Sequence, residues 1–352
     1  MWKRGTREYR NSIGYEWECR NQSCSHFGKR FWTNPAIQLE NGKRISNKIP
    51  LGIVDRIAEE MYGENVTPQK ICQELNENGI VVDKRTVTNS LARAAEFTWK
   101  RFTTDGRVKD LVGYRSGDKR YLYLLIDATP YFVKEGQMHC YIAQDHTSGL
   151  VIDFELSDSI DREAVDNLLS RILSNGYRPA VIISDEGGEI IRSVADKLPS
   201  VFHQYDLTHF ERRIEEKLLK HPSIDRSVLE LRRHLAYRLL ATVHSPEENI
   251  FYEGVNEIKR KSFLWQKDKV ASSVSNEFIE KSEHYSIHYR FPGCPACSNM
   301  AEGFFSLLDR KRKRNDLGRT KSKWSKHLAN IIALHNRKTL DKLTGKLFDV
   351  AT

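Results

Sequence analysis

Two aspartates close runs of apolar residues. Asp127 follows "YLLI" and Asp185 follows "VIIS", so each stands where a buried strand ends. Carboxylates at the carboxyl ends of neighbouring strands converge at the sheet edge where open α/β folds bind ligands. Such a pair in a low dielectric repels unless hard cations bridge it. The pattern predicts a Mg²⁺ or Mn²⁺ site, although each aspartate taken alone is also compatible with a strand-end turn such as "SDEGG".

A third carboxylate, Glu302, lies in "CSNMAEGFFSLLDRKRKR", residues 297–314. A helix beginning near Asn299 places Glu302, Phe305 and Asp309 on one side. This stripe has two interpretations: it packs into a core, or it presents Glu302 to the aspartates as a third metal ligand. In the second case the helix would also carry a basic block along DNA phosphates. That block comprises Arg310, Lys311, Arg312, Lys313 and Arg314.

Bringing the aspartates together requires a sheet, and the middle of the chain predicts one. Three β-rich runs are followed by alternating helices and strands. The expected strands are 120–129, 138–146, 149–156, 180–185 and 201–206, and the expected helices are 161–176, 189–198 and 208–220. Three antiparallel strands followed by this alternation are typical of a ribonuclease H-like α/β domain with a mixed sheet.

Upstream, residues 46–100 are predicted to form a helix-turn-helix. Thr67 is a suitable N-cap with Pro68 at the first helical position, and Asp83 or Lys84 opens a second short helix. The second helix carries donors suited to phosphates and base edges in a major groove: Lys84, Arg85, Thr86, Thr88, Asn89 and Arg93. A helical hairpin with a solvated polar face is the alternative interpretation.

Cysteines and histidines suggest zinc at two places. Cys19 and Cys24, with His26 nearby, resemble one knuckle of a zinc ribbon, but no second knuckle follows. Downstream, His284 and His288 precede Cys294 and Cys297, a set that would close a tetrahedral site just before Glu302. Surface cysteines without metal at the first place and a plain Cys-Pro-x-Cys turn at the second are the alternatives.

The composition is that of a folded, basic protein. The chain has 352 residues, 39% of them hydrophobic, and a net charge of +9. This balance favours a polyanionic partner without requiring one. Because no long apolar run or signal peptide is present, we expect a soluble intracellular protein, cytoplasmic or nucleoid-associated. Six cysteines are too few for a disulfide scaffold.

At these motifs the chain resembles DDE transposases of the Mutator-like superfamily and related prokaryotic insertion-sequence transposases. "LLIDAT" and "VIISDEGG" are similar to the segments around the two catalytic aspartates of that family. "YDLTH" is similar to its Cys/Asp-x2-His signature, and residues 297–314 to its Asn-x2-Glu-Gly-Phe segment. The resemblance covers about residues 121–336.

The resemblance implies a catalytic triad of Asp127, Asp185 and Glu302 that holds two divalent cations, Mg²⁺ or Mn²⁺, with Asp206 and His209 beside it. His209 would contact the scissile phosphate or orient the nucleophile, although capping of the helix at Thr208 is the alternative for this segment. The expected partners are DNA, as element terminal repeats and target, and further copies of the chain in a homodimer or higher oligomer on paired ends.

We therefore expect six regions along the chain. They are a zinc-ribbon-like remnant (1–45), a helix-turn-helix domain (46–100), a linker (101–120), the first part of the ribonuclease H-like core (121–220), a helical insertion (221–290), and the glutamate helix with basic C-terminal helices (291–352). Trp265 in the insertion either stacks on a flipped base or is buried. Three functions remain open: a DNA transposase, a domesticated DNA-binding regulator that does not cleave, and a ribonuclease H-like nuclease.

Overall fold

The computed structural model describes residues 2–9, 12–18, 30–33, 60–61, 64, 66–77, 82–87, 106–220, 225–315 and 320–344. The chain divides into two compact units, which are taken here one at a time. One unit comprises residues 105–132 and 136–306, and the other comprises Met1–Thr104, Val133–Glu135 and Leu307–Thr352.

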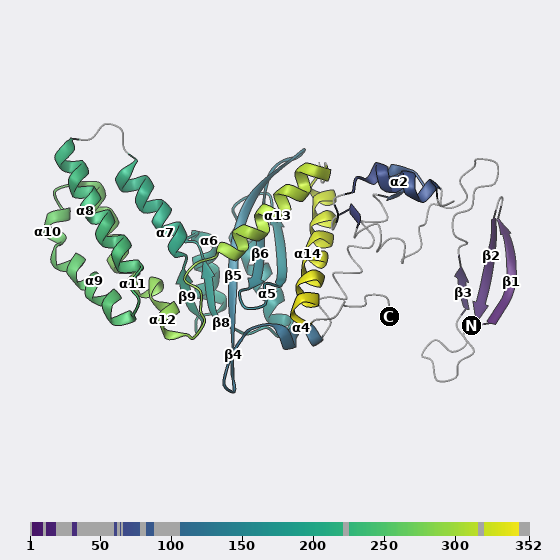
Figure 1. Cartoon of the computed structure of the whole chain (residues 1–352), viewed down its shortest axis with the longest axis horizontal. Helices are drawn as coiled ribbons and strands as arrows, with labels where there is room; N and C mark the ends of the chain where they lie inside the picture. The colour runs from purple at the N-terminus through teal and green to yellow at the C-terminus, as the bar shows by residue number, and fades with distance from the viewer. Residues whose placement is uncertain are drawn as a thin grey trace. The chain divides into compact units, whose positions relative to one another are not determined.

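A mixed six-stranded sheet forms the centre of the unit containing residues 105–132 and 136–306 (Figure 1). Its strands are β4 (Tyr114–Ser116), β5 (Lys119–Val133), β6 (Gly136–Asp145), β7 (Val151–Ser157), β8 (Pro179–Ser184) and β9 (Phe202–Tyr205). The spatial order is β7-β6-β5-β8-β9, with β4 paired to the start of β5. β7 runs antiparallel to β6, whereas β8 runs parallel to both β5 and β9.

This strand order confirms the expected ribonuclease H-like α/β fold class. The central strands β5 and β8 are continuous apolar runs because both faces of the sheet are covered. Helices follow the strands as expected: α5 (Arg162–Ser174), α6 (Gly188–Lys197) and α7 (Leu207–Ile214), which continues as a π-helical turn over Glu215–Leu219. Asp161 caps α5 by accepting a hydrogen bond from Glu163 N at 2.9 Å.

Residues 226–290 form the expected helical region. Its helices are α8 (Arg226–Val243), α9 (Glu248–Arg260), α10 (Ser262–Trp265), α11 (Lys269–Tyr285) and α12 (Ile287–Arg290). Aromatic residues of α9 and α11 pack with Phe210 of α7, so this region shares one core with the end of the sheet. Trp265 is 1% exposed and donates to Ile258 O, which confirms the buried alternative and excludes base stacking.

The predicted linker differs from the structure. Within residues 101–120 the chain forms α4 (Gly106–Leu111) and strand β4 (Tyr114–Ser116). Gly113 adopts φ +92°, where glycine is favoured, and its N–H donates to buried Asp145 Oδ2 at 3.1 Å. This polar segment is therefore held by a hairpin to β5 and by the long-range hydrogen bond to Asp145, which local composition does not reveal.

The other unit contains an antiparallel sheet and separate helical segments. Its elements are β1 (Trp2–Tyr9), β2 (Ser12–Glu18), β3 (Arg30–Thr33), α2 (Pro68–Glu77) and α14 (Lys321–Thr344). Lys70 N donates to Thr67 Oγ1 at 3.3 Å, which confirms Thr67 and Pro68 as the start of a helix. Asp83 similarly opens a helical turn over residues 84–87, since its Oδ1 accepts from Thr86 N at 2.6 Å. Among the described residues, no helix is long and apolar enough to cross a membrane.

Candidate active site

The parallel pairing of β5 with β8 brings the two aspartates to one sheet edge. The register aligns Ile126 with Ser184, so Asp127 and Asp185 are the next residues on adjacent strands. Asp127 is only 5% exposed. Burial raises its pKa to about 7; the Ala128 N–H opposes this shift and the charge of Asp185 adds to it. The sheet therefore holds one carboxyl poorly solvated beside a second.

Asp185 lies in a tight turn at the end of β8. Its Oδ1 accepts from Gly187 N at 3.1 Å, and the hydroxyl of Ser184 donates to Asp185 O at 2.7 Å. A Cβ added at Gly187 would lie 3.0 Å from Glu189 Oε1 and 3.1 Å from Asp185 Oδ1. Glycine at this position leaves the acidic edge uncrowded. The turn alternative for "SDEGG" is thus correct for the backbone and coexists with convergence of the aspartates.

Asp206 ties two helices of the site together. Its Oδ1 caps α7 by accepting from Thr208 N at 2.7 Å and His209 N at 3.3 Å. Its Oδ2 accepts from both the backbone N–H and the hydroxyl of Ser298, the residue before α13 (Asn299–Asn315). Asp206 is 1% exposed, so its four hydrogen bonds satisfy a carboxylate that would otherwise be costly to bury.

Glu302 occupies the first turn of α13 and faces α7. Its carboxylate accepts two hydrogen bonds from Arg212, Nη1 to Oε1 at 2.7 Å and Nη2 to Oε2 at 3.1 Å. This pairing lowers the pKa of Glu302. His209 Nε2 lies 3.6 Å from Glu302 Oε1, and that nitrogen is buried without a hydrogen-bond partner. The charge of a protonated His209 would also lower the pKa of Asp127. His209 is thus close enough to interact electrostatically with both Glu302 and Asp127.

Hard divalent cations suit this donor set in part. Two adjacent carboxylates, one of them buried, are oxygen ligands that Mg²⁺ and Mn²⁺ prefer. Among the described residues, however, no three His, Cys, Asp or Glu side chains gather closely enough to hold a metal ion. The aspartate pair therefore forms the core of the candidate site, and Glu302 stands near it in a contact with Arg212.

The four candidate zinc ligands downstream have separate surroundings. His284 Nδ1 is 2.9 Å from His203 O and its ring stacks on Tyr205, while His288 Nδ1 is 3.3 Å from Gln204 Oε1. Burial raises the pKa of Cys294 to about 12. Together with Cys297, these side chains do not form a metal cluster within the described part of the chain. Cys19 and Cys24 lie outside the described residues.

The predicted DNA-binding residues are placed differently from one another. Lys84 and Arg85 are exposed, but Thr86 is 7% exposed and packs inward, so the structure corrects its assignment to base contact. Asn89 and Arg93 lie outside the described residues. In the basic block of α13, side-chain exposure also varies. Arg310 is exposed, Lys311 is 9% exposed, Arg312 lies over the Trp324 ring at 5.8 Å, and the side chains of Lys313 and Arg314 are not described.

Two further charged residues at the site, Arg212 and Glu186, are not part of the sequence motifs. Arg212 lies one helical turn after His209, so helical spacing from that histidine could have identified it as a residue on the same face. Glu186 follows Asp185 and accepts from Arg213, Lys281 and Tyr285 at 2.5, 2.5 and 2.6 Å. Burial raises the pKa of Glu186, but these hydrogen bonds outweigh it and leave the pKa below its ordinary value. The network fastens the turn after β8 to α11.

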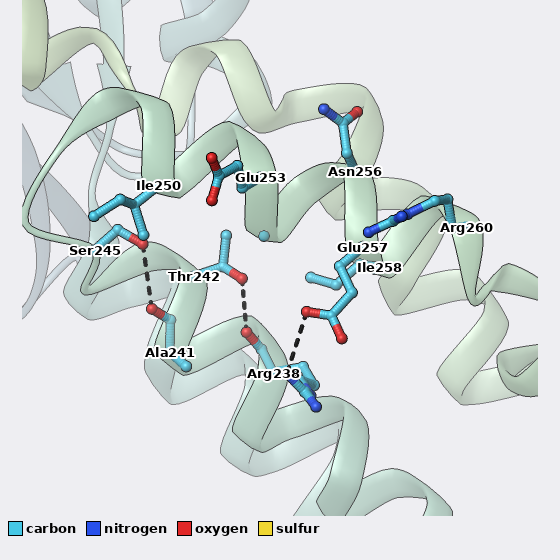
Figure 2. A pocket seen from close by; sticks show the side chains of 11 residues that line it. Arg238, Ala241, Thr242, Ser245, Ile250, Glu253, Asn256, Glu257, Ile258 and Arg260 are labelled. Atoms are coloured by element: carbon cyan, nitrogen blue, oxygen red, sulfur yellow. Dashed lines mark hydrogen bonds and ion pairs between the residues drawn. The ribbon is translucent and has the colours of Figure 1, made fainter.

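A separate pocket lies between α8 and α9 (Figure 2). Its volume is about 460 Å³, and its lining includes Arg238, Thr242, Glu253 and Glu257. Arg238 Nη1 donates to Glu257 Oε2 at 3.2 Å across it. None of the predicted catalytic residues lines this pocket.

Comparison with known proteins found no matching family model and no matching curated protein. Solved structures show remote similarity. The Drosophila P element transposase strand transfer complex is 12% identical, over 86% of this chain and 95% of that one, with a TM-score of 0.45. The simian T-cell lymphotropic virus intasome in complex with PP2A regulatory subunit B56 gamma is 13% identical, over 56% and 66% of the two chains, with a TM-score of 0.23.

The catalytic core domain of BIV integrase is 12% identical, over 53% of this chain and 97% of that one, with a TM-score of 0.19. Because these similarities are remote, the ribonuclease H-like fold is assigned from the strand order and strand pairing of this chain. The Mutator-like resemblance stays a prediction from the sequence motifs.

Proposed function

We propose that this chain is a DNA transposase of the insertion-sequence type that depends on divalent metal ions. The observation that carries the proposal is the register of β5 with β8, which sets Asp127 beside Asp185 at the carboxyl edge of a ribonuclease H-like sheet. Glu302 faces the same helix, α7, that carries His209. Asp127, Asp185 and Glu302 are the residues that would hold Mg²⁺ or Mn²⁺.

When bound, such ions would activate water or a DNA 3′-hydroxyl and stabilise the leaving oxygen of an in-line phosphoryl displacement. The residues of the chain supply the rest. Ser184 and Gly187 fix the Asp185 turn, and Asp206 fixes α7 against α13. His209, whose buried Nε2 has no hydrogen-bond partner, is placed to donate to or accept from a group entering the site. Exposed Lys84 and Arg85 are proposed to contact DNA.

The test is strand cleavage on labelled DNA that carries the ends of the genetic element encoding the chain. With Mg²⁺ or Mn²⁺ we expect nicking at those ends, followed by joining to target DNA, and no reaction in EDTA. Asp127→Asn, Asp185→Asn and Glu302→Gln should each lower the nicking rate by at least about 10³-fold, because each removes a charged oxygen ligand. The matched control is Glu280→Gln, an exposed carboxylate on α11, which should keep the wild-type rate.

Other outcomes separate the alternatives. Metal-dependent nicking without joining would identify a nuclease. Sequence-specific binding without cleavage, unchanged by the three substitutions, would identify a DNA-binding regulator and contradict the proposal.

A further inference from the structure

We propose that Arg212 is a positioning residue that competes with divalent cations for Glu302 and exchanges onto a DNA phosphate when the glutamate turns to the metal. This inference rests on the proposed function and adds a residue that the sequence motifs do not contain. It concerns how the third carboxylate is released to join the two aspartates.

The contact occupies both oxygens of Glu302. Arg212 Nη1 donates to Oε1 at 2.7 Å and Nη2 donates to Oε2 at 3.1 Å, a bidentate arrangement. The guanidinium takes two of the roughly four acceptor sites of the carboxylate, and its positive charge repels a cation that approaches the remaining ones. Arg212 and a divalent ion therefore compete for Glu302 through shared acceptor sites and through charge.

The scaffold holds the two partners in place. Arg212 and His209 lie one turn apart on α7, and Glu302 lies in the first turn of α13. Asp206 caps α7 and also binds Ser298, immediately before α13. Leu207 N donates to Ala296 O at 3.1 Å, which adds a backbone bond between the same two segments. The ion pair thus follows from the packing of the site, and it is not a chance meeting of two surface side chains.

The charges around Arg212 point toward the acidic edge. Glu302 is the main cause of the raised pKa of Arg212, and Asp206 and Asp127 contribute in the same direction. His209 lies one turn earlier on the same helix, with Nε2 3.6 Å from Glu302 Oε1. A guanidinium facing this edge is close to where a phosphate would approach bound metal.

Exchange is energetically accessible because the pair is open to solvent. The side chain of Arg212 is 55% exposed and that of Glu302 is 32% exposed. Ion pairs this exposed are weak. By contrast, Arg213, the next residue, pairs with Glu186, whose side chain is 9% exposed, and it belongs to the fixed network with α11. The two adjacent arginines on α7 therefore differ in role. Arg213 stabilises the fold through its contact with buried Glu186, whereas Arg212 can break its exposed contact with Glu302.

The test is a titration with Mn²⁺ in the absence of DNA, followed by electron paramagnetic resonance or calorimetry. Arg212→Gln should bind Mn²⁺ about two- to fivefold more tightly than wild type, because the competitor is gone. Arg212→Lys should lie between them, since an ammonium cannot pair with both oxygens in parallel. Arg233→Gln, an exposed arginine on α8, carries the same charge change and should bind as wild type does. Circular dichroism checks that each variant is folded.

In the Glu302→Gln background, Arg212→Gln should change Mn²⁺ affinity less than twofold. The single variant Arg212→Gln should also bind DNA more weakly than wild type. The slope of the logarithm of the DNA-binding constant against the logarithm of the salt concentration should fall in magnitude by about 0.9, which corresponds to the loss of one phosphate contact. Unchanged or weaker Mn²⁺ binding by Arg212→Gln, with binding still dependent on Asp127 and Asp185, overturns this inference alone. Mn²⁺ binding that is absent or indifferent to both aspartates overturns the proposed function as well.

Discussion

Burial shifts the pKa of single side chains at the carboxyl edge of the six-stranded sheet and inside it. Asp127 is the clearest example among the acids, and His203 among the bases. Desolvation lowers the pKa of His203 to about 3, and the nearby ring of His284 adds to the effect. His203 Nε2 lies 2.8 Å from Ser184 Oγ, so a neutral imidazole supports the residue that precedes Asp185.

The low pKa of His203 predicts loss of stability in acid. An unfolded histidine titrates near pH 6.5, so below that pH the unfolded chain binds a proton that the folded chain refuses. The free energy of unfolding should fall as the pH drops from about 6.5 toward about 3, by up to about 1.4 kcal/mol per pH unit. Urea unfolding between pH 4 and pH 7 measures this, with His203→Gln as the control that cannot titrate.

The expected signature is that wild type loses stability relative to His203→Gln as the pH falls. His288, whose pKa is lowered to about 4, contributes equally to both proteins. Parallel stability curves for the two proteins would contradict this assignment.

At the scale of elements, helices are placed by buried polar clamps and close backbone approach. Asp206 joins the starts of α7 and α13, and Glu186 joins the end of β8 to α11. In the helical region, α9 approaches α8 through Gly254. A Cβ added there would lie 2.5 Å from Thr242 Oγ1 and 2.8 Å from Thr242 Cγ2.

Gly254→Ala should therefore destabilise the protein although alanine favours helix. Thr242 is 5% exposed and its hydroxyl donates to Arg238 O at 2.8 Å, so turning the side chain away would break that bond and moving the helices apart is the alternative. We expect a loss of ~1–3 kcal/mol of unfolding free energy, measured by urea denaturation. The matched control is Gly303→Ala on α13, where an added Cβ meets nothing within 4 Å. That change should stabilise the protein by ~0.5–1 kcal/mol, and equal effects at both glycines would refute the packing argument.

At the scale of the whole molecule, the chain combines a net charge of +9 with an acidic sheet edge at Asp127 and Asp185. Basic charge elsewhere draws a polyanion toward the protein, while the aspartates are suited to metal rather than to phosphate directly. Cleavage at both ends of a DNA element also needs one such edge at each end. The proposed function therefore requires more than one copy of the chain in the active assembly.

We expect light scattering after size exclusion to find two or more chains on a DNA that carries both element ends. Because assembly should depend on the paired ends, an unrelated duplex of equal length is the control and should not yield the same defined complex. A single chain bound to paired ends would contradict the expected oligomer.

Much of the ribonuclease H-like core is predictable from local pattern. Apolar runs ending in Asp127 and Asp185 indicate buried strands, and helical periodicity after each strand indicates the crossovers. Caps such as Thr67 and Asp83 follow from side-chain chemistry that acts within three residues. Polar segments are less predictable. Residues 101–120 contain α4 and β4, and β4 pairs with β5. Thr86 packs inward despite its polar hydroxyl.

The sequence by itself determined the identity of the carboxylates and the elements that carry them, because strand ends and helix starts are set by short-range periodicity and capping. Only the tertiary structure decided their partners. The pairing of β5 with β8 makes Asp127 and Asp185 neighbours, and the packing of α7 against α13 gives Glu302 to Arg212. His284 and His288 likewise turn to backbone and glutamine partners rather than to the cysteines. Such choices depend on contacts between residues about 60 to 90 positions apart, where burial and hydrogen-bond geometry override sequence spacing.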